Sequence, residues 1–81
     1  MWYVYVLRSE STKSKTYIGA TEDLNKRLSE HNAGVVYYTK RYMPWKIETY
    51  IAFSSKDKAY SFEKYLKVGS GKAFLNKRLL D

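Results

Sequence analysis

Residues 16–34 place side chains capable of acid–base chemistry at the junction between a strand pattern and a helix pattern. Tyr17 lies in the strand pattern just before Gly19, and Arg27 and His31 follow in the helix pattern. Because Arg27 and His31 are four positions apart, they lie one turn apart on the same helix face. A strand that leads directly into a helix holds such side chains on rigid elements. We therefore interpret this stretch as half of a candidate active site, which still needs an acid.

Glu63 is the acid that is hardest to explain as part of the scaffold. It lies four residues after Ala59 and three before Leu66, on or beside the buried stripe of its predicted helix. A carboxylate there needs a partner, because burying an unpaired charge is costly. That partner is either a cation of the protein, Arg27 or a lysine, or a bound metal ion. Spacing alone does not decide between an ion pair and a metal ligand.

The other candidate side chains each have a structural interpretation as well. Tyr5 and Tyr17 belong to a residue type that is common in strands. Arg27 can pair with Asp23, four residues earlier on the same helix face. His31 can act as a cation at the C-terminus of its helix, where the helix dipole favours positive charge. Only the combination of these residues points to a functional site.

The hydrophobic pattern predicts the elements that position these side chains. Residues 2–7 and 15–20 are typical of strands, and the polar segment between them is short. We expect an antiparallel hairpin that brings Tyr5 near Tyr17.

The rest of the chain predicts an α+β domain that spans residues 1–81, with a small, three-stranded, mostly antiparallel sheet flanked by helices. Its element order is ββα, loop, βαα. After the hairpin the expected elements are a helix capped by Thr21 and ended by Asn32 and Gly34, an irregular loop at 35–46, a strand at 47–53, a helix from the capping-box residue Ser54 to about Lys67, and a last helix capped by Ser70.

Composition narrows the function classes. The 81 residues include no cysteine and one histidine, which excludes disulfides and zinc sites built from thiolates or several histidines. Neither a signal peptide nor a run of about 20 apolar residues is present, so we expect a soluble, cytoplasmic protein without a membrane partner. The net charge of +7 fits a polyanionic partner such as nucleic acid, or equally a basic protein kept soluble by charge.

The predicted loop at 35–46 alternates aromatic and basic residues, a composition suited to DNA. We expect Lys40, Arg41 and Lys46 to meet phosphates, and tyrosines such as Tyr38 and Tyr42 to stack on unpaired bases. Trp45 is more simply explained as a residue that closes the small core.

These spacings resemble the GIY-YIG nuclease superfamily, most of all its small stand-alone single-domain bacterial group, over residues 2–67. Residues 3–5 and 17–19 correspond to the two strand motifs, although Tyr3 replaces the first glycine and Ala20 stands where some relatives carry a lysine. The other matching positions are Leu24, Arg27, Leu28, His31, Asn32, Gly34, Thr39, Pro44, Trp45, Glu63, Leu66 and Lys67.

The resemblance implies a divalent-metal-dependent DNA endonuclease of repair or recombination. Glu63 then holds Mg²⁺ or Mn²⁺, and Tyr17 deprotonates the attacking water. Arg27 clamps the phosphate, Tyr5 orients the water or the phosphate, and His31 acts as a second base or as a proton relay to Tyr17. The expected partner is DNA, in branched, flapped or single-stranded form. The alternatives are a DNA-binding module of the same fold with weak or no activity, and a protein-interaction domain.

Overall fold

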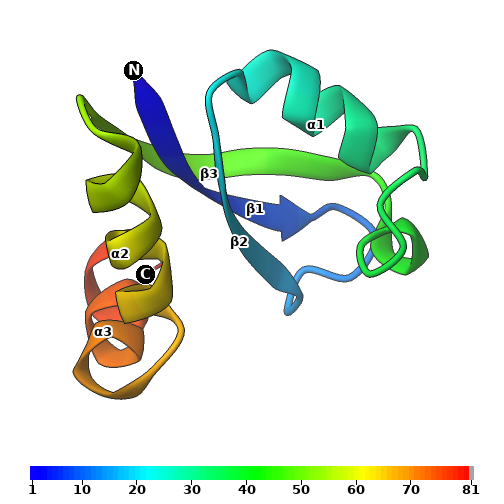
Figure 1. Cartoon of the computed structure of the whole chain (residues 1–81). Coiled ribbons are helices and arrows are strands. Elements are labelled where there is room, and N and C mark those ends of the chain that lie inside the picture. Colours follow the sequence, from blue (N-terminus) through cyan, green and yellow to red (C-terminus); the bar gives the residue numbers. More distant parts are fainter. Residues whose placement is uncertain (81) are drawn as a thin grey trace.

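A three-stranded antiparallel sheet forms the centre of the computed structural model, which describes residues 1–80. Its strands are β1 (Trp2–Ser9), β2 (Thr16–Thr21) and β3 (Trp45–Phe53), and β1 lies between the other two (Figure 1). The continuous apolar run of β1 suits this central place, because both of its faces are covered. Asp81, the last residue of the predicted domain, lies outside the described residues.

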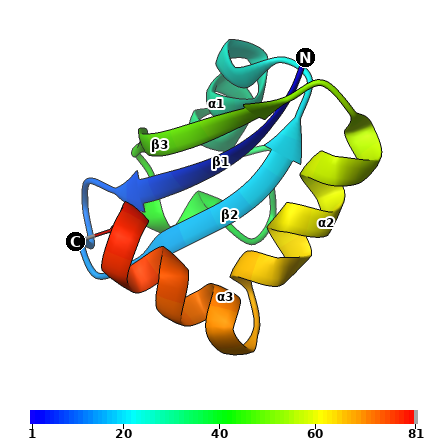
Figure 2. The same ribbon diagram turned by 90° about the vertical axis from the view of Figure 1, so that its left-hand side faces the viewer.

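Helices cover both faces of the sheet. α1 (Leu24–Asn32) lies on one face, and α2 (Lys56–Leu66) and α3 (Gly69–Phe74) lie on the other (Figure 2). A short 3-10 turn, η1 (Lys40–Tyr42), precedes β3, and a π-helical turn, η2 (Leu75–Leu79), continues from α3. The predicted fold class and element order are confirmed. None of the described helices is both long and apolar enough to cross a bilayer.

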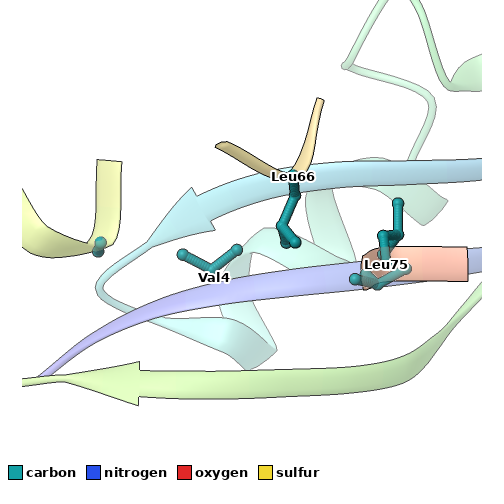
Figure 3. Packing of buried hydrophobic residues seen from close by; sticks show 5 residues of the cluster. Val4, Leu66 and Leu75 are labelled. Carbon is teal, nitrogen blue, oxygen red and sulfur yellow. The ribbon is translucent and has the colours of Figure 1, made fainter. Parts of the chain in front are cut away.

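Successive side chains of β1 point to opposite faces, which produces an apolar cluster on each side of the sheet. On the α2–α3 side, Val4 packs with Leu66 and Leu75, and Figure 3 shows these side chains between sheet and helices. On the α1 side, Tyr5 packs with the buried Trp45. The phenol of Tyr5 therefore belongs to the layer between the sheet and α1, and Trp45 closes the core as expected.

The helix caps differ from the predicted ones by one or two residues. Asp23 caps α1, and Thr21, the predicted cap, is the last residue of β2. The Thr21 hydroxyl instead accepts the N–H of Asp23 in a turn between strand and helix. The two later caps are Ser55 for α2 and Val68 for α3, in place of the predicted Ser54 and Ser70.

Candidate active site

Tyr5 extends from the central strand across a glycine. Tyr5 pairs with Gly19 in the β1–β2 hairpin, and a Cβ atom at Gly19 would lie 2.5 Å from Cζ of Tyr5. A glycine at this position lets the phenol lie against the neighbouring strand, a common reason for glycine within a strand. The side chain of Tyr5 is almost completely buried.

A chain of hydrogen bonds runs from Tyr5 through His31 into the loop after α1. The Tyr5 hydroxyl lies 3.0 Å from His31 Nε2, and His31 Nδ1 lies 2.7 Å from the Thr39 hydroxyl. Thr39 in turn donates to the Val36 carbonyl at 3.4 Å. Both His31 and Thr39 are fully buried. Strand β1, helix α1 and the loop that follows α1 therefore meet in one polar chain on the α1 side of the sheet.

The direction of these bonds assigns the tautomer of His31. Thr39 donates its only hydroxyl proton to the Val36 carbonyl, so it accepts the proton of His31 Nδ1–H. Nε2 then carries a lone pair and accepts the hydroxyl proton of Tyr5. The remaining lone pairs of the Tyr5 oxygen are free to receive donors from the site.

His31 is neutral at physiological pH. Burial and, to a lesser extent, the positive charge of Arg27 lower the pKa of its imidazole to about 4, against a smaller opposite effect of Glu30. The structural interpretation of His31 as a cation at the helix end is therefore wrong, since the ring is buried and uncharged. The relay expected from His31 to Tyr17 also lacks a hydrogen bond, because both ring nitrogens are engaged by Tyr5 and Thr39.

Tyr17 stands at the outer side of the same cluster. Its ring centroid lies 6.5 Å from that of Tyr5 and 5.0 Å from that of His31, as the predicted hairpin requires. Unlike Tyr5, it is only half-buried. Tyr17 is thus the phenol that is more open to solvent, whereas only a small part of Tyr5 is accessible.

Arg27 lies beside the Tyr5 phenol and remains partly exposed. Its Nη1 donates to Glu30 Oε1 at 2.9 Å, so its ion-pair partner is Glu30 and neither Asp23 nor Glu63. Burial raises the pKa of Tyr5, and Arg27 offsets part of that rise while the charges of Tyr17 and Glu63 add to it. The guanidinium therefore sits where it stabilises negative charge that develops near the phenol.

Glu63 approaches the cluster from α2, the helical layer on the opposite face of the sheet. Its side chain is 16% exposed, and Oε2 accepts from Lys67 Nζ at 2.9 Å. Of the two expected ion-pair partners, a lysine rather than Arg27 is the observed one. The carboxylate is near enough to raise the pKa of Tyr5, so it acts on the site electrostatically. It makes no direct hydrogen bond to Tyr5, Tyr17 or Arg27 within the described chain.

The described residues fit a metal site with one carboxylate ligand, but not a site with several protein ligands. No group of three or more histidine and acidic side chains that could hold a metal occurs among residues 1–80. A single carboxylate suits Mg²⁺ or Mn²⁺, which keep several water ligands and bind phosphate oxygens. Glu63 meets that requirement, provided that Lys67 gives up its place at Oε2.

The residues predicted to bind nucleic acid are exposed or partly exposed, and one of them lies in a different element from the predicted one. Lys40 and Arg41 are exposed in η1, while Lys46 is exposed in β3 rather than in a loop. β3 begins earlier than predicted because its backbone pairs with the end of β1. Tyr38 is 69% exposed. Tyr42 is half-buried against Trp45, at a ring distance of 6.4 Å, so it has less surface to offer a base.

Thr39 is the member of the cluster that residue patterns did not single out as functional. It belongs to an irregular loop, where no hydrophobic period marks a side chain as buried. Asn32 has a structural role beside this loop. Its side-chain amide accepts a hydrogen bond from the Trp45 N–H at 2.6 Å and donates one to the Trp45 carbonyl at 2.9 Å. These two bonds fix the loop between α1 and β3, and with it the position of Thr39.

The structure is thus an α+β domain in which two tyrosines of the sheet meet a histidine and an arginine of α1, with one acid on α2. The chain belongs to the GIY-YIG family: the family model described as "GIY-YIG catalytic domain" matches residues 1–78.

Individual relatives fall into two groups. A UPF0213 protein of Streptococcus pyogenes serotype M5 is 42% identical over 66 residues, which cover 80% of this chain and 70% of that protein. The structure-specific endonuclease subunit slx1 of Schizosaccharomyces japonicus is 42% identical over 64 residues, or 73% of this chain but only 23% of the relative. The solution NMR structure of a UPF0213 protein from Bacillus halodurans superposes with a TM-score of 0.56 at 26% identity, covering 98% of this chain and 87% of that one.

Proposed function

We propose that this chain is a divalent-metal-dependent DNA endonuclease that hydrolyses phosphodiester bonds in repair or recombination. The observation that carries the proposal is the meeting of Tyr5, Tyr17 and His31 beside the Arg27 guanidinium. The relatedness to structure-specific endonuclease subunits supports DNA as the substrate. The chain spans less than a quarter of the length of those proteins. The form of DNA that it prefers is therefore proposed here rather than taken from them.

In the proposed mechanism Tyr17 is the general base, because it is the phenol of the cluster that water can reach. Arg27 binds the phosphate oxygens and stabilises the charge that grows on them during attack. Tyr5 orients the water or the phosphate through its free lone pairs. His31 positions Tyr5 by accepting the hydrogen bond of its hydroxyl.

Glu63 would hold the Mg²⁺ or Mn²⁺ ion. When bound, such an ion polarises the phosphate and neutralises the charge on the leaving oxygen. With an ion held there, Lys67 would lose its ion-pair partner.

Cleavage of nicked, flapped and branched DNA in Mg²⁺ or Mn²⁺ tests this proposal. Glu63→Ala and Tyr17→Phe should each abolish cutting, while metal-free DNA binding and thermal stability persist. Glu10→Ala and Tyr50→Phe are matched controls, since both residues are exposed and lie outside the cluster. Retained cutting in both active-site variants would refute the assigned roles.

A second candidate is a DNA-binding module of the same fold that does not cut. The Glu63–Lys67 ion pair favours it, because a lysine already neutralises the carboxylate that we propose as the metal ligand. DNA binding that weakens with salt, together with no cleavage in either metal, would identify this function. Absence of salt-sensitive DNA binding would exclude both candidates and favour a protein-interaction domain.

A further inference from the structure

A groove of ≈ 600 Å³ opens beyond Tyr17, lined by β2 on one side and by the ends of α2, α3 and η2 on the other. We propose that this groove binds one nucleotide of a DNA single strand, with the base against Tyr38 and the phosphate at Lys72. The inference rests on the proposed function, because Tyr17 belongs both to the groove and to the candidate active site. It adds a binding site for the strand on one side of the scissile bond.

The aromatic side of the groove offers a surface for a base. Tyr38 is 69% exposed, and its ring lies 6.0 Å from that of Tyr17 at an interplanar angle of 40°. Tyr17 is supported in turn by His31, at a ring distance of 5.0 Å. The ring of Tyr17 therefore packs against Tyr38, while much of the Tyr38 side chain stays exposed to solvent. Base–aromatic stacking on such a surface tolerates any sequence, since every base has a π-face.

The groove has an apolar floor that suits a base as well. Ile18, Leu66 and Leu75 line it, and the last two belong to the core cluster that Figure 3 shows. Because these residues are fixed by core packing, the floor is preformed rather than made by a mobile loop.

The opposite side of the groove is cationic. Lys67 and Lys72 line it, together with the amide of Asn76, and no acidic residue is among its described lining residues. Within residues 1–80, Lys72 takes part in none of the three ion pairs, so its charge is available to a phosphate. Lys67 pairs with Glu63, so Lys72 is the lysine that is available to a phosphate. A cation opposite an aromatic wall matches the two parts of a nucleotide, a flat base and an anionic phosphate.

A second aromatic depression near the site lacks this complementarity. It lies on the other side of Arg27, where Trp2 and Tyr60 provide rings. Three carboxylates, Glu22, Asp23 and Glu30, line that depression together with two cations, Lys26 and Arg27, so its lining carries a net charge of −1, whereas the groove at Tyr38 has no acidic lining residue among those described. Charge therefore favours the groove at Tyr38 as the place where a strand leaves the active site.

The test measures binding without metal, so that it does not depend on catalysis. The probes are a fluorescein-labelled ten-nucleotide oligothymidylate and an abasic oligomer of the same length, followed by fluorescence anisotropy in EDTA. Tyr38→Ala should weaken binding of the thymidine oligomer about tenfold, the loss of one stacked base, and leave the abasic oligomer unchanged. Tyr38→Phe should restore binding because it keeps the ring.

Lys72→Ala should weaken both probes alike and reduce the slope of log affinity against log salt by about 0.7, the value for one phosphate contact on a single strand. The controls are Tyr50→Ala and Lys58→Ala, which remove an exposed ring and an exposed charge away from the groove.

The inference is overturned if Tyr38→Ala weakens the two probes equally, or if Lys72→Ala behaves like Lys58→Ala. Thermal unfolding confirms that each variant is folded, and the exposure of both side chains makes loss of the fold unexpected. An inactive enzyme that binds the oligomers in this pattern would refute the nuclease proposal alone. Cleavage that is insensitive to the groove variants, together with unchanged probe binding, would refute this inference alone.

Discussion

Acid is expected to destabilise this fold through one buried side chain, His31. Its folded-state pKa is about 4, while an unfolded histidine titrates near 6.5. The unfolded state therefore binds a proton more readily than the folded state between these values, and stability must fall as the pH decreases from 6.5 toward 4. Above pH 6.5 this contribution is fully present, since the imidazole is neutral in both states.

The size of the effect follows from that difference in pKa. Proton linkage gives a loss of about 2 kcal/mol at pH 5 and about 3 kcal/mol at pH 4, relative to pH 7. The imidazole is fully buried between Tyr5 and Thr39, so little solvent screening reduces these values. A loss of this size is a large part of the stability of a small domain.

Carboxylates also titrate in this range, and a matched variant removes their contribution. His31→Gln keeps an amide that can bond to Tyr5 or Thr39 but has no proton to gain. Urea unfolding of both proteins at pH 7, 6, 5 and 4 gives the difference in unfolding free energy. The wild-type protein should be more stable at pH 7, and its advantage should shrink by about 3 kcal/mol by pH 4. Parallel pH profiles for the two proteins would show that His31 is not held neutral by burial.

Three further changes test the packing and the charges of the site. Gly19→Ala places a methyl group against the ring of Tyr5, and urea unfolding should show a loss of about 2 kcal/mol from overpacking. Lys67→Met removes the cation paired with Glu63 and should tighten Mn²⁺ binding up to about fivefold, as measured by titration followed by water proton relaxation. In the double variant with Glu63→Gln, this gain in Mn²⁺ affinity should vanish. Asn32→Ala loses two hydrogen bonds to the start of β3 and should cost about 2 kcal/mol, with unchanged stability counting against that bridging role.

Much of the architecture could be predicted because it depends on local patterns. The apolar run in β1 marked a buried strand, and the leucines of α1 marked its buried side. The hairpin followed from two strands with a short polar connection, and its register brought Tyr5 and Tyr17 together as expected. Helix caps were less predictable, since several adjacent polar residues can serve and the end of the preceding strand decides among them.

The composition of the candidate site was predictable only in part. Spacing placed Arg27 and His31 on one helix face and singled out Glu63 as an acid beside a buried stripe, and resemblance supplied its role as a metal ligand. Neither spacing nor resemblance could show that Thr39 completes the chain of hydrogen bonds, or that Lys67 forms an ion pair with Glu63. Thr39 lies in an irregular loop whose position depends on tertiary packing, whereas Lys67 lies only four residues after Glu63 and is one of several cations that could pair with it.

The sequence by itself determined the order of the elements, the basic charge and the residue types available for chemistry. It could do so because hydrophobic period and formal charge are properties of neighbouring residues. The tertiary structure alone decided that His31 is neutral, that Tyr5 is buried while Tyr17 is open, and that Glu63 is paired with a lysine. Protonation and hydrogen-bond partners depend on burial and on distances of about 3 Å, which are set only when strands and helices are packed together.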